Sequence, residues 1–424
     1  MTKYSLILLL LAVLSMPNAQ AMAQDDSGKV IQRCVTMRLD TPMPPRIGYG
    51  LKRMKQRDID IGDAPVVVQP VMAGLRGPSL TLLGRDVRLA VTTGQSSPQE
   101  LWQNSLWNHD QIACAQPSVK TIQQAIARGW YWRGTFDNSV GMTTYEPKII
   151  YRSRAVLSAL LVRPYGFTFG GGISAPITTN TTALLDLPDQ RQPIRRDMAR
   201  FSNGGGIERL FASWRHTPLV DTHLAVTAGV LEEMYGGFGA EVLYRPFGSP
   251  FWVGMDGWEV WRRDADSTLN MRWTDARSFT AHVRIGYDVP DTRWRISVAG
   301  GRYLAGDTGA TLAALRVFEN GARATASLTW TDRREDEGFF HDSHLDPMLR
   351  VVWPLGTSGH KETQTSLRQV GRDGGQMLDR PMPLEDMTEA FSAREIIRQW
   401  PALLADKKSR PKAAIRFLKV GNKK

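Results

Sequence analysis

The sequence has few cysteines and, after its first residues, no long apolar run. Only two cysteines, Cys34 and Cys114, occur among 424 residues, which excludes a cysteine-based metal cluster or a disulfide-rich scaffold. In an oxidising compartment they could form one disulfide; two free thiols remain an alternative, because sequence does not fix their distance. After residue 23 no apolar stretch approaches the roughly 20 residues that a membrane-spanning helix needs. A mature chain that crosses a membrane must therefore do so with strands paired around a closed barrel.

The first residues have the pattern of a secretory signal peptide. Lys3 gives a positive start, residues 6–14 are apolar, and small residues allow cleavage after Ala21 or Ala23. The apolar run is too short for a membrane-anchoring helix. No cysteine follows either cleavage position, which disfavours a lipoprotein anchor. We expect residues 1–23 to be removed during export from the cytoplasm.

The chain is basic, with 53 Lys and Arg against 42 Asp and Glu, a net charge of +11. Part of the excess is concentrated near the C-terminus, in Lys407, Lys408, Arg410, Lys412, Arg416, Lys419, Lys423 and Lys424. Two readings stay open for this stretch. It is either a solvated basic tail or a segment attracted to an acidic polymer or to anionic lipid head groups.

From about residue 148 to 355, apolar and polar side chains alternate. The clearest example is 322–331, where alanine, leucine and tryptophan alternate with arginine, threonine and serine, and 281–287 and 294–298 repeat the pattern. Turn signals such as Asn320-Gly321 separate the segments. Strict alternation predicts strands with one apolar and one polar face, roughly 10–12 of them.

Alternation alone does not distinguish a membrane barrel from a soluble sandwich, because both have one apolar face. Aromatic residues gather near the segment ends, as the interfacial girdles of membrane barrels require. The apolar faces also use many small residues, which would fill a dense soluble core poorly. The predicted fold is therefore mainly β, a transmembrane antiparallel β-barrel over 148–355 in the outer membrane.

The segments before the barrel have a different character. Residues 24–75 are predicted to be an irregular lead-in, and 76–130 a small periplasmic α/β unit. Within that unit, 79–83 and 86–92 are expected to be strands. Helices are expected to begin at Ser97 and to run over 118–128.

After the barrel, 356–424 is predicted to be a polar tail with one helix. Residues 356–385 are polar and glycine-rich, with no period. Ser392 and Glu395 have capping-box spacing, which predicts a helix from there to Leu404.

Three stretches carry a family resemblance: GVLEEMYGGFGAEVLYRP at 229–246, GGRYLAGDTGAT at 300–311 and RDGGQ at 372–376. We call them the signature stretches. They resemble the YjbH/GfcD family of exopolysaccharide and capsule outer-membrane proteins, and weaker likeness extends the resemblance over roughly residues 80 to 385. Family members are typically longer, with two barrel-bearing halves, and this chain matches the C-terminal half only.

The resemblance implies a β-barrel that helps to export a surface polysaccharide together with small periplasmic and lipoprotein partners. A separate chain that supplies the missing N-terminal half is a further expected partner, unless one barrel suffices. Glu232, Glu233 and Asp307 are the candidates for mutation. The glycines of the signature stretches are expected to have a structural role in turns and close strand approach rather than in ligand binding. These signature residues are Glu232, Glu233, Tyr235, Gly236, Gly237, Gly239, Arg302, Tyr303, Gly306, Asp307 and Gly309.

If the apolar positions face lipid, the alternate positions line the lumen. The inward set then consists of Arg209, Arg215, Glu241, Arg245, Arg284, Arg295, Arg323 and Arg350. Guanidinium groups bind carboxylates and phosphates with two hydrogen bonds, so this lining would favour an anionic glycan. The alternative is an internal ladder of Arg and Glu that only fills a small barrel, and both readings stay open.

We find no arrangement of residues typical of an enzyme. There is no nucleophile elbow and no phosphate loop, and His341, Asp342, His344 and Asp346 are better explained by a solvated loop than by a metal site. We expect no catalytic residue, no cofactor and no nucleic-acid partner. The leading hypothesis is an outer-membrane pore or scaffold for export of an anionic or neutral exopolysaccharide, in contact with outer-membrane lipids. The alternatives are a glycan-modifying hydrolase of the cell envelope and a purely structural barrel.

Overall fold

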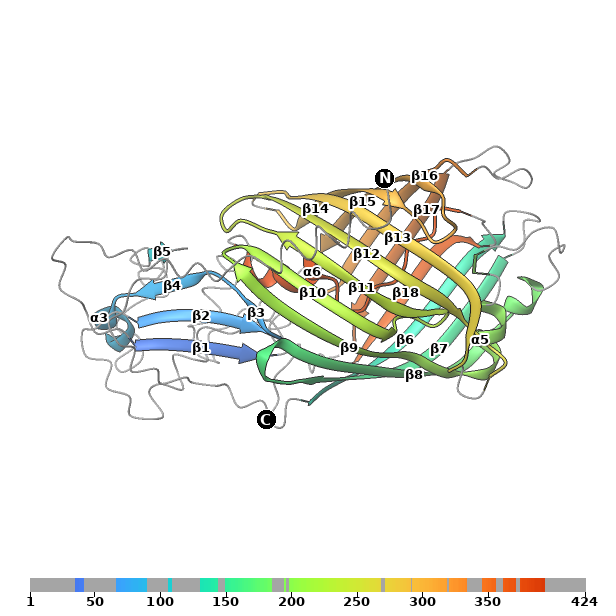
Figure 1. Cartoon of the computed structure of the whole chain (residues 1–424), viewed down its shortest axis with the longest axis horizontal. Coiled ribbons are helices and arrows are strands. Elements are labelled where there is room, and N and C mark those ends of the chain that lie inside the picture. The colour runs from blue at the N-terminus through green and yellow to red at the C-terminus, as the bar shows by residue number, and fades with distance from the viewer. Residues whose placement is uncertain are drawn as a thin grey trace. The chain divides into compact units, whose positions relative to one another are not determined.

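The computed structural model describes residues 35–41, 66–89, 106–108, 130–143, 149–184, 194–195, 198–267, 271–290, 292–318, 320–333, 345–355, 361–370 and 374–392. Its main feature is a closed β-barrel of consecutive strands, β6 to β18 (Figure 1). The strands are β6 (Trp130–Thr143), β7 (Ile149–Val162), β8 (Phe167–Thr179), β9 (Gly206–Leu219), β10 (Thr222–Val230), β11 (Tyr235–Tyr244), β12 (Phe251–Arg263), β13 (Trp273–Asp288), β14 (Trp294–Arg302), β15 (Thr308–Val317), β16 (Arg323–Thr331), β17 (Leu345–Pro354) and β18 (Lys361–Val370).

Neighbouring strands of the barrel are antiparallel, and β18 closes it by pairing in parallel with β6, Lys361 opposite Gly134. The parallel pair follows from the strand number. An odd number of strands in an up-and-down order leaves the first and last pointing the same way. The predicted β-barrel is confirmed, but the expected count of 10–12 strands is too low.

The barrel also begins earlier and ends later than the alternation predicted, at Trp130 and Val370 rather than at 148 and 355. The two extra strands have a weak pattern. In β18 the inward Gln364 and Ser366 alternate with Thr363 and Thr365, so both faces are polar and the period of two is hidden. The prediction that 356–385 contains no strand was therefore wrong for 361–370.

The two ends of the barrel differ in their connections. At one end they are short, for example 220–221 and 245–250; we call it the short-turn end. At the other end lie the long connections 180–205 and 332–344; we call it the long-loop end. Of the first of these, the structure describes η4 (Thr181–Leu184) and α5 (Met198–Gly204). At the short-turn end, η3 (Pro164–Gly166) joins β7 to β8.

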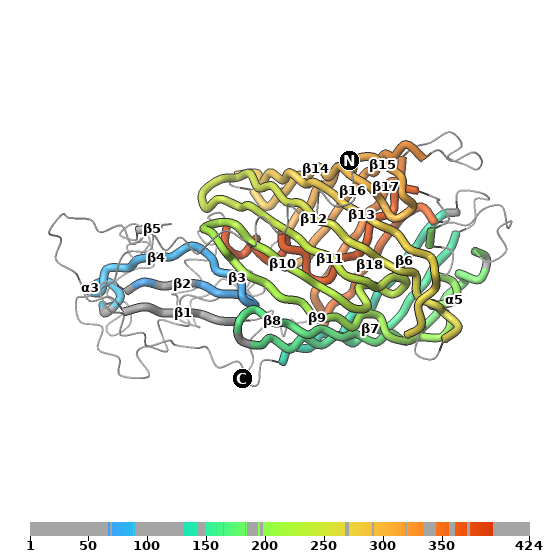
Figure 2. The backbone as a smooth tube through the Cα atoms, in the orientation of Figure 1, coloured from blue at the N-terminus to red at the C-terminus, as the bar shows by residue number. Residues whose placement is uncertain are grey.

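After β18 the chain turns back into the barrel. Residues 374–392, which we call the C-terminal segment, run along the lumen and include α6 (Leu384–Met387) and η6 (Thr388–Phe391). Figure 2 shows this part of the chain in red behind the front strands of the barrel. The helix α6, labelled in Figure 1, contacts β10 and β11. Leu384, Met387 and Phe391 pack there against apolar wall residues that include Ala225, Leu243 and Trp252.

A separate small sheet precedes the barrel, in the order β1-β2-β4-β5, with β3 paired to β2. Its strands are β1 (Val35–Thr41), β2 (Val66–Met72), β3 (Leu75–Arg76), β4 (Ser79–Leu82) and β5 (Leu106–Asn108). The expected strand at 79–83 is present as β4. The expected strand at 86–92 is wrong for its described part, because α3 (Gly84–Arg88) occupies these positions, with Asp86 in its first turn.

Several expectations fall outside the described residues: the cleavage site, the helices at 97 and 118–128, the helix that ends at Leu404, the basic tail, and both cysteines, Cys34 and Cys114. Among the described residues, no helix is long and apolar enough to cross a membrane.

Candidate functional site: the lumen and its C-terminal segment

The three signature stretches meet where the C-terminal segment enters the lumen at the long-loop end. The backbone N–H of Gly375 donates to Asp307 Oδ2 at 2.7 Å, and that of Asp379 donates to Glu232 Oε2 at 2.8 Å. The Leu304 N–H donates to the Gln376 carbonyl at 3.0 Å. Residues from 229–246, 300–311 and 372–376 thus form one structure that holds the C-terminal segment. We call this structure the clasp.

Two acids of the clasp, Glu232 and Glu233, are themselves held by arginines. Arg195 forms an ion pair with Glu232 at 2.7 Å, and Arg152 forms one with Glu233 at 2.6 Å. Burial alone would raise the pKa of the Glu233 carboxyl, but Arg152 and Arg154 outweigh it and lower the pKa to about 2. Burial likewise opposes the charge on Arg195, and the neighbouring Glu232 nevertheless raises its pKa. Glu233 therefore remains charged at neutral pH.

The other signature residues shape the same end of the barrel. Tyr235 is buried, and its hydroxyl donates to the Ile194 carbonyl at 3.0 Å; Tyr303 is also buried and shares a hydrogen bond with Thr311 at 2.8 Å. Arg302 is exposed and near Gly306, which has a φ of +83°. This φ lies in the left-handed region, where glycine is favoured.

Four signature glycines leave room for an aromatic ring or a neighbouring strand. A Cβ at Gly236 or Gly239 would lie 2.1 Å or 2.3 Å from the ring of Trp273 or Trp258, respectively, and one at Gly309 would lie 2.0 Å from the Trp330 carbonyl oxygen. Gly237 has a φ of +157°, and a Cβ there would lie 2.1 Å from the Glu259 carbonyl oxygen. The packing supports the structural role expected for these glycines.

In the middle of the lumen, Arg380 of the C-terminal segment is surrounded by acids. It forms an ion pair with Glu241 of β11 at 2.8 Å, and another with Glu385 of the segment itself. Glu241 also accepts the Leu384 backbone N–H at 3.1 Å, at the start of α6. Arg284, on β13, is paired with Asp256 on β12. The segment is thus bound to the wall through buried charges.

At the short-turn end, two wall arginines share one acid and reach the segment. Arg245 and Arg295 bind Asp288 at 2.9 Å and 2.8 Å. Arg245 also donates to the Glu385 carbonyl and to Thr388 Oγ1, both at 2.9 Å. Arg295 lies 3.4 Å from the carboxylate of Glu389. The segment therefore passes along the whole lumen, from the clasp to this arginine pair.

The predicted lumen-lining set has a mixed outcome. Arg245, Arg284 and Arg295 and the acid Glu241 are in ion pairs with the wall or the segment, Arg209 is paired with Asp379, and Arg350 donates to Gln364 at 2.7 Å. Arg323 is half-buried and interacts electrostatically with Asp386 of the C-terminal segment. Arg215 is 1% exposed, and none of its side-chain nitrogens has a hydrogen bond to a described residue. Most of the set thus belongs to the internal ladder, and glycan contact stays a prediction.

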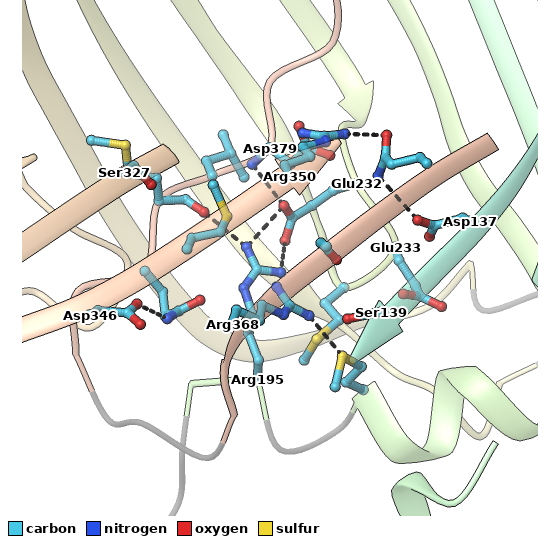
Figure 3. Close-up of a pocket in the computed structure, with 18 of the residues that line it drawn as sticks. Asp137, Ser139, Arg195, Glu232, Glu233, Ser327, Asp346, Arg350, Arg368 and Asp379 are labelled. Carbon is cyan, nitrogen blue, oxygen red and sulfur yellow. Dashed lines mark hydrogen bonds and ion pairs between the residues drawn. The ribbon is translucent and has the colours of Figure 1, made fainter. Parts of the chain in front are cut away.

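A cavity of about 280 Å³ lies between the clasp and the wall formed by β6, β7 and β15 to β18 (Figure 3). Five arginines line it: Arg152, Arg154, Arg195, Arg350 and Arg368. Its acids are Asp137, Glu208, Glu232, Glu233, Asp346 and Asp379, and hydroxyl and amide groups fill much of the rest. Such a lining suits a polar, hydroxyl-rich ligand.

Our sequence reasoning missed several of these charges. Arg152 and Arg154 alternate with Tyr151 and Ser153 along β7, so the same period-of-two rule could have found them. Arg380 and Glu385 could not have been found, because they lie on a segment without a repeating pattern. Among the residues that the structure describes, no group of His, Cys, Asp and Glu could hold a metal ion; His341 and His344 lie outside them.

Comparisons with known proteins point to the same family that the signature stretches resemble. A family model described as "Exopolysaccharide biosynthesis protein YbjH" matches residues 81–390. A curated relative from Escherichia coli (strain K12), described as "Uncharacterized lipoprotein YjbH", is 36% identical over 168 residues. The match covers 38% of this chain and 24% of the relative, so the chain spans about a quarter of that protein's length. The chain belongs to the YjbH family of exopolysaccharide biosynthesis proteins.

Proposed function

We propose that this chain is an outer-membrane barrel that takes part in exopolysaccharide export, and that its lumen is closed by its own C-terminal segment until export requires passage. The observation that carries the proposal is the opposite character of the two faces of the wall. The outward side chains are apolar and exposed, for example Val226, Phe238, Ile285, Leu312 and Leu328, whereas the inward ones are charged. An apolar outer band is what lipid requires of a barrel.

Aromatic side chains at both ends of the band support a membrane location. Trp130, Tyr244, Trp294 and Trp353 are exposed near the short-turn end, and Trp273 and Trp330 near the long-loop end. Such girdles lie at the two membrane interfaces of outer-membrane barrels, where short turns face the periplasm and longer loops face the exterior. The clasp and the cavity are then on the outer side.

The occupied lumen supports a gated barrel over a permanently open pore. An open pore would leave the inward arginines free for a glycan, but most of them are in ion pairs with the wall or with the C-terminal segment. Buried ion pairs hold the segment because breaking one leaves an uncompensated charge. We therefore propose a gated barrel with no catalytic role. Its periplasmic and lipoprotein partners, or a separate chain that supplies the rest of the longer relative, would act on the segment.

Gene deletion with cell fractionation tests this proposal. We expect the protein in the outer-membrane fraction, loss of secreted polysaccharide on deletion, and recovery with the wild-type gene. Purified protein is expected to leave the polysaccharide uncleaved, which separates this function from a hydrolase. Recovery of the protein in the inner membrane, or unchanged secretion after deletion, would contradict the proposal.

A further inference from the structure

The cavity at the long-loop end contains two guanidinium groups whose hydrogen-bond partners are neutral. Arg350 Nη2 donates to the Gln364 side-chain oxygen at 2.7 Å, and Arg368 Nη2 contacts the sulfur of Met198 at 3.1 Å. The Nε of Arg350 is buried without a hydrogen bond to any described residue. Within the described part of the chain, neither arginine is in an ion pair.

The other arginines of the cavity, and most of its acids, have opposite charges as partners. Arg154 binds Glu208 at 2.5 Å and Asp137 at 2.7 Å, and Asp379 is paired with Arg209. Arg152 binds Glu233, and Arg195 binds Glu232. Asp346, the acid on the same strand as Arg350, accepts the side-chain amide of Gln376 at 2.7 Å. Arg350 and Arg368 are thus the cations of the cavity that remain available to an incoming anion.

The two arginines are placed to act together. In the register of β17 and β18, Arg350 is opposite Ser366, and Arg368 is two residues further along the same inward face. Diagonal neighbours of this kind are about 7–8 Å apart at the backbone, which long side chains can span. Long side chains from neighbouring positions of this kind can converge, and two guanidinium groups that converge can bind one carboxylate or phosphate from two sides.

The rest of the lining suits a sugar. Ser139 and Ser327 present hydroxyl groups (Figure 3). Ser366 adds a third hydroxyl group, and Gln364 and Gln376 add amides. The volume of about 280 Å³ is near the lower limit of about 300 Å³ for small-molecule sites. The space therefore suits a short piece of a glycan rather than a long polymer strand.

We propose that this cavity is a binding site for an acidic sugar residue of the exported polysaccharide, with Arg350 and Arg368 as the groups that bind its anionic oxygen atoms. This inference rests on the proposed export function, because that function supplies the glycan. The site would bind polymer at the outer end of the closed barrel, beside the clasp.

Calorimetry on the full-length protein in detergent micelles tests the site, with trigalacturonate as the acidic probe, maltotriose as the neutral one and inorganic phosphate as the free anion. We expect trigalacturonate to bind, with a Kd at least about tenfold lower than that of either other probe, because only it offers both a carboxylate and sugar hydroxyls. The double variant Arg350→Gln/Arg368→Gln should raise that Kd at least about tenfold. Arg350→Lys/Arg368→Lys, which keeps the charges but loses the paired hydrogen bonds, should be intermediate.

Arg316→Gln is the matched control, because Arg316 is on the outward face of β15, against the rings of Trp294 and Phe318, and it should leave the Kd unchanged. Trigalacturonate that binds the Gln double variant as tightly as the wild type would overturn the inference, as would equal affinity for maltotriose or for phosphate alone. Secretion by the deletion strain is measured separately. Unchanged secretion would refute the export function, whereas the calorimetry alone decides whether the acidic-sugar site exists.

Discussion

Arg380 is the residue whose removal should loosen the C-terminal segment most. Its guanidinium is in ion pairs with Glu241 and Glu385, and Asp256 is 3.9 Å away. The Arg380 side chain is only 9% exposed. Replacing it with Ala leaves these acids without their shared cation in a buried site.

The magnitude follows from the cost of an uncompensated buried charge. Removing one partner of a buried ion pair typically costs about 3–5 kcal/mol. Each 1.36 kcal/mol is a factor of ten in a population, so local opening of the segment should become roughly 150-fold to 5,000-fold more frequent. The barrel strands have their own ladder of hydrogen bonds, so we expect the effect to be confined to the segment.

Hydrogen exchange measured by mass spectrometry on the protein in micelles is the assay. Amides of residues 374–392 should exchange faster in Arg380→Ala by at least about a hundredfold, while peptides from β10 to β13 keep their wild-type rates. Arg277→Ala is the control, because Arg277 is exposed and its ion pair with Glu259 is on the surface, where such pairs contribute little. If residues 374–392 exchange at the same rate in Arg380→Ala, in Arg277→Ala and in the wild type, buried ion pairs do not hold the C-terminal segment in place.

Two further predictions concern the clasp end of the barrel. Gly239→Ala places a Cβ 2.3 Å from the Trp258 ring, so it should destabilise the barrel by about 1–3 kcal/mol and weaken its heat-resistant band in electrophoresis. Gly300→Ala should not destabilise the barrel, because the nearest atom to its Cβ would be 3.8 Å away. Equal loss of the heat-resistant band in the two variants would contradict this packing. Glu233→Gln should lower the melting temperature at pH 7, because the wild-type carboxylate binds arginines. This difference in melting temperature should shrink as the pH falls from about 4.3, the ordinary pKa of glutamate, toward about 2, where the carboxyl of the folded protein is protonated. A difference in melting temperature that stays constant down to pH 2 would contradict the charged state of Glu233.

The wall of the barrel was predictable from sequence wherever its outer face is apolar. In β13, Val283 and Ile285 alternate with His282 and Arg284, and the structure places the first pair outward and the second inward. Strand β18 was missed because Thr363 and Thr365 occupy its outward positions and give no contrast with the inward side. Alternation reports burial differences, so it does not detect a strand that is polar on both faces.

The content of the lumen could not be predicted in the same way. Glu232 and Asp307 stood out within the signature stretches, but their partners, the backbone N–H groups of Asp379 and Gly375, are far away in the sequence. The C-terminal segment has no apolar period, because it is surrounded by the barrel wall and is held by buried charges as well as by Leu384, Met387 and Phe391. Only the closed barrel brings these residues together.

Single-channel conductance in planar bilayers tests most directly whether the C-terminal segment closes the barrel. The full-length protein should show no stable open steps. A variant that ends after Val370, and that still gives the folded band in electrophoresis, should show large, regular ones. Equal open steps from the full-length protein and from the truncated variant would contradict a lumen closed by its own C-terminal segment.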